Sequence, residues 1–309
     1  MSFARTAILK AAQSPWLRER APRFGFVRRT VNRFMPGEDA NDALSAARTL
    51  AGKGIATVLT HLGENITDRA EAEQVKQHYI DLTQRIVSTQ LPTEISIKLT
   101  QVGLDLDPEF CYANVVAIIE RTPPDKTVWI DMEQSPYVDA TLAIFRRART
   151  AYANVGICVQ AYLYRTAQDL DSLIPMRAAI RLVKGAYNEP AELAFPVKKD
   201  VDENYFHLAQ RLLSPESRKL GVRAAIATHD KVIINRLNAW AESQGVPKHL
   251  TEYQMLYGIQ RAEQQRLAEA GYRSTVLVAY GTFWFPWFMR RLAERPANVL
   301  FLARNFFAD

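Results

Sequence analysis

Cysteine is scarce in this chain of 309 residues: only Cys111 and Cys158 occur, far apart and each within an apolar run. Two isolated cysteines argue against a disulfide scaffold and against a thiolate metal cluster, so we expect a protein of the reducing cytoplasm. Long apolar runs are missing as well. No run approaches the roughly 20 residues that a membrane-spanning helix needs, and no secretory signal is visible.

A glycine-rich fingerprint is absent after the first strand-like run, where the chain instead continues with Gly63-Glu64-Asn65. This absence disfavours a Rossmann fold, whose first helix opens with such a fingerprint. The histidines are scattered and show no metal-ligand spacing, so we expect no metal site. The alternative is a metal held at strand ends by His61, His229 and Asp131.

Positive charge is in modest excess, with a formal net charge of +6, and it is densest near the N-terminus. Such a segment is typical of a solvated helix face, of a membrane-surface or nucleic-acid patch, or of a transit peptide. We favour the solvated helix and keep a peripheral contact with the inner face of the membrane as a hypothesis. The basic residues are Arg5, Lys10, Arg18, Arg20, Arg23, Arg28, Arg29 and Arg33.

Short runs rich in Val, Ile and Leu alternate with longer amphipathic stretches along most of the chain. The expected strands are Ile55–His61, Ile95–Leu99, Val128–Asp131, Val155–Tyr162, Ala179–Val183, Ala224–Thr228, Glu252–Leu256 and Thr275–Tyr280. Each gap leaves room for a crossover helix, as parallel strands require, and 309 residues suit a barrel with extensions. The pattern predicts an α/β fold, a (βα)8 TIM-type barrel, with a doubly wound open sheet as the alternative. We expect an N-terminal helical extension over residues 1–50 and the barrel over residues 51–309.

Charged or amide side chains occur at most of the expected strand ends, inside otherwise apolar runs. Burying such groups costs several kcal/mol unless they are paired or serve a site. In a barrel of this kind the chemistry collects at the carboxyl ends of the strands, so we expect these side chains to converge on a ligand pocket.

The segment Phe288-Met289-Arg290-Arg291-Leu292-Ala293-Glu294 follows the last expected strand and has a helical pattern. Neighbouring arginines on a helix diverge by about 100°, so two guanidiniums can close on one carboxylate from two sides. Glu294 shares their face, three and four residues on. Two cations with one anion fit an amino acid, although a solvated helix face with an intrahelical ion pair has the same pattern.

The fifth expected strand carries Arg181 and Lys184, with Gly185 at a position where the backbone can approach a ligand closely. Positive charge at a barrel mouth suits phosphate or a reduced, negatively charged cofactor. Lys184 also fits a Schiff-base lyase or aldolase barrel, which requires a carbonyl substrate. A non-catalytic protein that binds nucleic acid through its basic surface is a further alternative.

Seven short motifs together resemble the proline dehydrogenases of the small monofunctional bacterial type, from about residue 20 to the end. The motifs are Leu62-Gly63-Glu64, Ser96-Ile97-Lys98-Leu99-Thr100, Ile130-Asp131-Met132-Glu133, Gln160-Ala161-Tyr162, Arg181-Leu182-Val183-Lys184-Gly185-Ala186-Tyr187, Ala227-Thr228-His229 and Arg290-Arg291-x-x-Glu294. The resemblance implies a distorted barrel that holds FAD non-covalently, with the final helix over the mouth. It implies oxidation of L-proline to 1-pyrroline-5-carboxylate by hydride transfer from ring C5 to flavin N5, with a quinone-type electron acceptor.

The same resemblance assigns roles around the substrate. Arg290 and Arg291, joined by Lys98, would hold the substrate carboxylate, Glu294 would orient Arg290 or the clamp, and Asp131 would fix Lys98. Arg181 would lie at the reactive edge of the flavin. The implied catalytic residues are Lys98, Asp131, Arg181, Tyr187, Arg290, Arg291 and Glu294, and the implied substrate-pocket residues are Leu182, Leu277, Tyr280 and Trp287.

The flavin and its diphosphate would be lined by a second group of residues, and residues 252–255 would reach the adenosine end. The implied cofactor-binding residues are Gln160, Arg181, Val183, Lys184, Gly185, Ala186, Lys198, Thr228, His229 and Gln254.

Two pocket positions depart from the family pattern, in which tyrosines stand where this chain has Leu277 and Trp287. Loss of a hydroxyl at Leu277 removes a polar contact, and Trp287 adds bulk. The carboxylate clamp is intact, so the substrate class is expected to be a cyclic imino acid. Proline is the first candidate, and 4-hydroxyproline or another substituted ring is the alternative.

Overall fold

The structure is a computed structural model that describes residues 31–294, with backbone only for the last turn of the final helix, residues 291–294. Eight parallel strands, each hydrogen-bonded to the next, form a closed barrel in chain order. The predicted (βα)8 barrel is therefore confirmed. The strands are β1 (Ala56–His61), β2 (Thr93–Ile97), β3 (Val128–Ile130), β4 (Val155–Gln160), β5 (Ala179–Val183), β6 (Arg223–Ala227), β7 (Glu252–Leu256) and β8 (Arg273–Tyr280).

Closure occurs between β1 and β8, which pair in register from Ala56 opposite Thr275 to His61 opposite Tyr280. The strands could be recognised in the sequence because parallel strands buried on both faces are continuous apolar runs. In β4 all the side chains from Val155 to Gln160 are buried.

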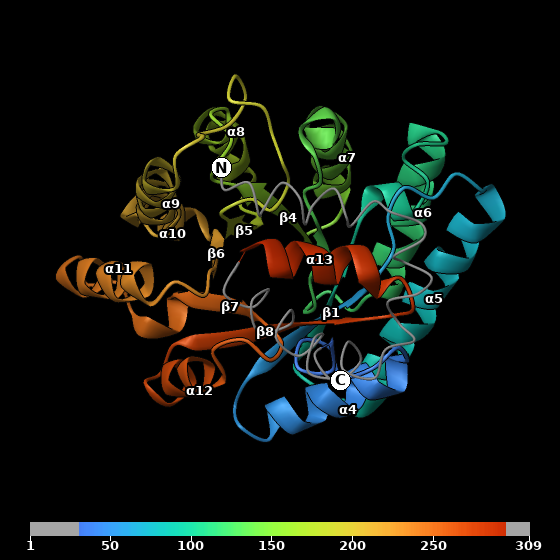
Figure 1. Cartoon of the computed structure of the whole chain (residues 1–309), viewed down its shortest axis with the longest axis horizontal. Helices are drawn as coiled ribbons and strands as arrows, with labels where there is room; N and C mark the ends of the chain where they lie inside the picture. Colours follow the sequence, from blue (N-terminus) through green and yellow to red (C-terminus); the bar gives the residue numbers. More distant parts are fainter. Residues whose placement is uncertain (1–30, 295–309) are drawn as a thin grey trace, which may run out of the picture.

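Helices surround the barrel and cover its outer wall (Figure 1). They are α4 (Ala40–Ala51), α5 (Arg69–Thr89), α6 (Pro108–Arg121), α7 (Val138–Ala151), α8 (Thr166–Leu173), α9 (Lys198–Leu212), α10 (Pro215–Leu220), α11 (Lys231–Ser243) and α12 (Arg261–Glu269). Several begin at an aspartate cap, such as Asp68, whose side chain accepts from the backbone N–H of Glu71 in α5. Such caps satisfy backbone donors that a helix start leaves unpaired.

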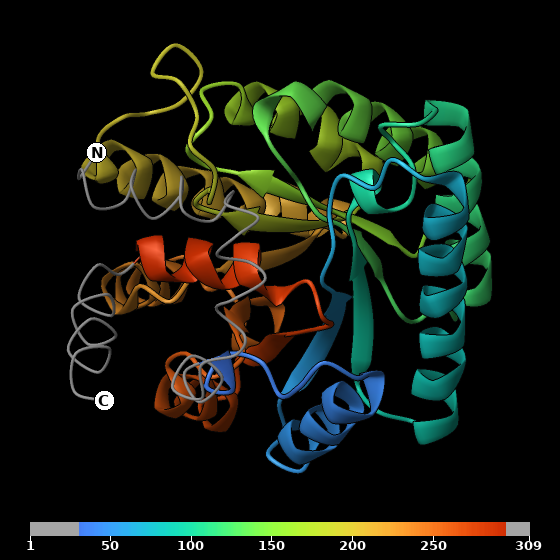
Figure 2. The same cartoon turned by 45° about the vertical axis from the view of Figure 1, so that its right-hand side comes forward.

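The barrel is distorted in the way the resemblance implies, because its last helix does not pack on the outer wall. The helix α13 (Trp284–Glu294) crosses the middle of the ring of helices at one end of the strands (Figures 1 and 2). Its apolar residues Trp284, Trp287 and Phe288 pack with Leu62 and Ala279 in a separate apolar cluster. The outer wall beside β8 and β1 is instead covered by α4.

Residues 1–30 lie outside the described part of the chain, so the predicted division between an N-terminal extension and the barrel near residue 50 stays a prediction. Within residues 31–294, none of the helices has the length and apolar character required to cross a bilayer.

Candidate functional site

A cavity of about 1070 Å³ opens at the carboxyl ends of the strands, under α13. This volume is slightly above the range of about 300–1,000 Å³ that small-molecule sites usually occupy, so a large ligand fits. Most of the predicted site residues meet in it. The cavity is lined, among others, by Lys98, Asp131, Gln160, Arg181, Val183, Lys184, Gly185, Ala186, Tyr187, Lys198, Thr228, His229, Gln254, Leu277, Trp287 and Arg290.

Two residues predicted in the substrate pocket, Leu182 and Tyr280, do not line this cavity. Successive side chains of a strand point to opposite faces, and Arg181 and Val183 take the inward positions of β5. Leu182 is therefore completely buried on the outer side, where the hydroxyl of Tyr205 donates to its carbonyl oxygen at 3.1 Å. Tyr280 likewise faces outward from β8, where its hydroxyl lies 2.7 Å from Nε2 of His78 in α5.

Asp131 lies between two cations at the centre of the cavity. Its Oδ2 accepts from Nζ of Lys98 at 3.2 Å, and its Oδ1 accepts from Nη1 of Arg181 at 2.9 Å. Burial by itself raises the pKa of Asp131. The positive charges of Lys98 and Arg181 outweigh this effect, so the pKa lies below its ordinary value. Burial lowers the pKa of Lys98, and Asp131 with nearby Tyr187 outweighs this effect and raises it. At neutral pH the pair is an ammonium and a carboxylate.

Arg181 is almost fully buried in the barrel interior, and two of its nitrogens have protein acceptors. Nε donates to Oε1 of Gln254 at 2.7 Å, and Nη1 donates to Asp131 and to Oγ of Ser96. The third nitrogen, Nη2, is buried and has no partner among the described residues. The same holds for Oε1 of Gln160. Unpaired buried polar atoms are costly, so these two indicate a polar ligand in the cavity.

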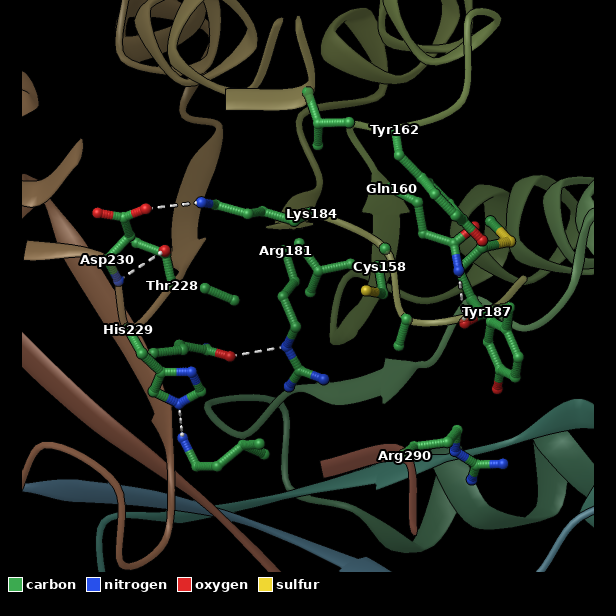
Figure 3. A pocket seen from close by; sticks show the side chains of 18 of the residues that line it. Cys158, Gln160, Tyr162, Arg181, Lys184, Tyr187, Thr228, His229, Asp230 and Arg290 are labelled. Carbon is green, nitrogen blue, oxygen red and sulfur yellow. Dashed lines mark hydrogen bonds and ion pairs between the residues drawn. The ribbon is translucent and has the colours of Figure 1, made fainter. Parts of the chain in front are cut away.

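A carboxylate-rich group of residues surrounds Lys184 at one end of the cavity (Figure 3). Its Nζ donates to Asp202 at 2.5 Å and to Asp230 at 2.9 Å, and Lys198 pairs with the same two carboxylates. Burial by itself raises the pKa of Asp230. The hydrogen bond from Lys184 and the charges of Lys184 and Lys198 together outweigh burial, so the pKa of Asp230 lies below its ordinary value. Asp202 was missed in the sequence, whereas Asp230 was expected at the strand end Thr228-His229-Asp230 but was given no role.

Arg290 of α13 forms the opposite end of the cavity, beside Tyr187 (Figure 3). Its Nη1 and Nη2 donate to the two carboxylate oxygens of Glu64 at 2.7 and 3.0 Å, and its Cζ lies 5.6 Å from the centre of the Tyr187 ring. Glu64 therefore orients Arg290 in this structure, a role that the resemblance implied for Glu294. The side chains of Arg291 and Glu294 lie outside the described residues, and their roles stay predictions.

Gly185 provides space at the end of β5. Its φ of +120° is rarely adopted by residues with a side chain, and an added Cβ would lie 2.2 Å from the ring of Tyr162. The next loop contributes Glu189, a buried carboxylate that the sequence analysis missed, which accepts from the backbone N–H of Ser135 at 2.8 Å. Glu189 ties the loop after β5 to the loop after β3.

Of residues 252–255, which the resemblance places at the adenosine end of the cofactor, Gln254 and Met255 line the cavity and Glu252 does not. Their contact with the adenosine stays a prediction. Glu252 begins β7, so it lies at the amino end of the barrel, where Nε of Arg223 donates to it at 2.7 Å. His229, one of the predicted cofactor residues, accepts at Nε2 from the backbone N–H of Leu256 at 2.9 Å.

The fold and the site together define a (βα)8-barrel protein with a cation-lined ligand cavity at the carboxyl ends of its strands. The family model for proline dehydrogenase matches residues 43–304, and the chain belongs to this family. Proline dehydrogenase 1 of Bacillus subtilis (strain 168) is 37% identical over 303 residues, which are 97% of this chain and 98% of that protein. Proline dehydrogenase of Deinococcus radiodurans is 36% identical over 307 residues, 97% of each chain.

Solved structures give the same fold. The crystal structure of proline utilization A from Bdellovibrio bacteriovorus, inactivated by N-propargylglycine, matches with a TM-score of 0.79 and 23% identity. The match covers 94% of this chain and 36% of that one, so this chain corresponds to about a third of the larger protein. At this identity the likeness supports the barrel assignment alone.

Proposed function

We propose that this protein is an FAD-dependent proline dehydrogenase that oxidises L-proline to 1-pyrroline-5-carboxylate. The observation that carries the proposal is the buried guanidinium of Arg181, whose Nη2 has no partner among the described residues and which lies in one cavity between Lys184 and Arg290. When bound, FAD supplies at its N5 the acceptor for the hydride that leaves ring C5. Family membership supports the choice of proline.

The residues at the Arg290 end are suited to hold a small carboxylate. Lys98 and Arg290 both line the cavity and both carry a positive charge, and Arg291 is expected to add a second guanidinium. Burial by itself lowers the pKa of Arg290. The carboxylate of Glu64 outweighs this effect, so the pKa lies above its ordinary value. Fixing the carboxylate at these cations orients the substrate ring, which is a large part of what catalysis requires for a direct transfer.

The ring itself would contact an apolar wall made by Tyr187, Leu277 and Trp287. Burial raises the pKa of Tyr187 above its ordinary value, so the phenol stays neutral at neutral pH. Such a wall excludes water from the reacting carbon, and excluding water strengthens the charge interactions of Lys98 and Arg290 with the substrate.

The cavity also fits the cofactor at its other residues. Arg181 Nη2 can donate to a flavin heteroatom, and the unpaired Oε1 of Gln160 can accept from a flavin N–H. Lys184 and Lys198 can bind the diphosphate, in exchange for part of their contacts with Asp202 and Asp230. We propose that the cofactor also contacts other residues that line the cavity, namely Val183, Gly185, Ala186, Thr228, His229 and Gln254.

A Schiff-base lyase is less compatible with this geometry. A nucleophilic lysine must be a neutral amine, whereas Lys184 is held by two carboxylates and the pKa of Lys98 is raised by its surroundings. The alternative substrates stay within the proposed chemistry, because Leu277 and Trp287 both line the cavity where the family usually has tyrosine. 4-Hydroxyproline or another substituted cyclic imino acid would use the same carboxylate clamp.

We further propose a quinone-type electron acceptor and a peripheral contact with the inner face of the membrane. The support is the basic character of the N-terminal sequence, which suits an anionic bilayer surface. Co-sedimentation with anionic liposomes, tested in both redox states of the flavin, measures this contact. Absence of binding in both states would remove this part of the proposal.

Colour is the direct test of the main proposal. The purified chain, incubated with FAD and freed of excess, should be yellow and should bleach anaerobically on addition of L-proline. A panel of L-proline, 4-hydroxyproline and other ring-substituted imino acids, compared by bleaching rate, identifies the preferred ring. A chain that remains colourless with excess FAD would overturn the proposal.

A further inference from the structure

A second charged network, formed by Arg223, Glu94 and Glu252, lies at the amino end of the barrel, and none of these three residues lines the cavity. Arg223 of β6 donates to both oxygens of Glu94 at 2.6 and 3.0 Å and to both oxygens of Glu252 at 2.7 and 3.0 Å. Burial by itself raises the pKa of Glu252. The guanidinium of Arg223 outweighs this effect, so the pKa lies below its ordinary value and the carboxylate is ionised. The proposed reaction uses neither carboxylate.

Gln254 connects this network to Arg181. Its Nε2 donates to Oε1 of Glu252 at 2.7 Å, and its Oε1 accepts from Nε of Arg181 at 2.7 Å. The carboxylate therefore fixes the direction of the amide, because a flipped amide would face N–H toward N–H at Arg181 and oxygen toward oxygen at Glu252. Both contacts are buried, where a mismatched pair is costly.

The guanidinium of Arg181 is planar, so fixing Nε and Nη1 also fixes the direction of Nη2. Nε is fixed by Gln254 and Nη1 by Asp131 and Ser96. Trp129 packs against both arginines. The centre of its ring lies 4.5 Å from Cζ of Arg181 and 5.1 Å from Cζ of Arg223, which supports the same arrangement. Figure 3 shows the guanidinium of Arg181 near the centre of the cavity.

We propose that Glu252 is a positioning residue, which holds the Arg181 guanidinium toward the flavin through the amide of Gln254. This inference rests on the proposed function, since it assigns a purpose to the direction of Nη2. It predicts that Glu252 influences the flavin without touching it. A structural role alone would affect folding and leave the properties of the bound flavin unchanged.

The test is the midpoint potential of the bound flavin in Glu252→Gln, measured by anaerobic spectroelectrochemistry. Loss of a negative charge by itself would raise the potential, because the reduced flavin is the more negative form. Loss of the Arg181 position removes a nearby positive charge and lowers the potential. We expect a lower potential, with kcat for proline reduced about tenfold and KM changed by no more than about twofold.

Glu94→Gln is the matched control, because it also removes a buried carboxylate from Arg223 and Glu94 has no contact with Gln254 among the described residues. We expect its potential to stay unchanged or rise. Gln254→Leu should reproduce the lowered potential without changing charge. In a double-mutant cycle, Glu252→Gln added to Gln254→Leu should no longer lower the potential, since Glu252 acts through Gln254, and what remains is the rise expected from the lost charge alone.

Glu252→Asp retains the charge and serves where Glu252→Gln does not fold, with a smaller lowering of the potential expected. An unchanged or raised potential in these Glu252 variants, or equal effects in Glu94→Gln, would overturn the inference. The wild-type chain keeps the two proposals apart. If it is yellow and bleached by proline while the Glu252 variants keep its potential, only the positioning role fails; if it binds no flavin, both fail.

Discussion

The guanidinium of Arg290 and the carboxylate of Glu64 form a two-point ion pair across the mouth of the barrel, with N–O distances of 2.7 and 3.0 Å. The pair joins α13 to the segment after β1, and both side chains are largely buried. A bidentate pair fixes both distance and orientation. Glu64 thus holds in place both the final helix and Arg290, one of the cations proposed to bind the substrate.

Glu64→Gln tests this arrangement. The amide cannot accept at both positions, so Arg290 is held less firmly and we expect kcat/KM for proline to fall about tenfold, mainly through KM. Steady-state kinetics measure the change. The control is Glu71→Gln, an exposed position in the first turn of α5, which should leave both constants unchanged. Equal kinetics for both variants would contradict the role given to Glu64.

Leu277→Tyr tests the ring preference. Adding the hydroxyl that the resemblance implies for this position should raise kcat/KM for proline by about threefold to tenfold, the value of one added hydrogen bond. Leu277→Phe adds a ring without the hydroxyl and is the control for bulk. No gain in Leu277→Tyr over Leu277→Phe would show that the hydroxyl is unimportant in this pocket.

Gly185→Ala tests the fit of the backbone beside the cavity. The substitution places a methyl group against Tyr162 at a φ of +120°, so we expect a loss of about 2–4 kcal/mol in the free energy of unfolding and reduced FAD content. Gly221→Ala is the control, since Gly221 also has a positive φ, of +81°, and its added Cβ meets nothing within 4 Å. It should lose only about 1–2 kcal/mol and keep its flavin. Similar flavin content in the two variants would refute the steric explanation.

His61 and His78, two partly buried histidines whose rings are in contact, predict that the free energy of unfolding depends on pH. Burial, then His78 and Lys98, lower the pKa of His61 to about 4, and the rings of His61 and His78 lie 4.4 Å apart. The folded state therefore binds fewer protons than the unfolded state between pH 6.5 and 4, and stability falls as the pH decreases through this window.

His61→Gln should reduce the stability difference between pH 7 and pH 5, measured by urea unfolding, by on the order of 2 kcal/mol. The exposed His207 provides the control, and His207→Gln should keep the wild-type difference. A His61→Gln variant with the full wild-type pH dependence would show that His61 is not the responsible group.

Much of the barrel could be predicted because its strands are buried on both faces and are therefore apolar along their whole length. The expected run Glu252–Leu256 agrees with β7 residue for residue, and Ala179–Val183 agrees with β5. Proline dehydrogenase membership was also recognised from short motifs, and the family comparison confirms it. The lining of the cavity was predictable where polar residues directly follow apolar strands, as Lys98 and Asp131 do.

The sequence alone determined the order of strands and helices and the residue types at the strand ends, since both depend on local apolar periodicity and on turn chemistry. Only the tertiary structure decided which side chains face the cavity. Leu182 and Tyr280 are directed outward because a shift of one residue along a strand reverses the face. The pairing of Glu64 with Arg290, 226 residues apart, likewise depends on barrel closure, which brings the first strand, β1, beside the last, β8.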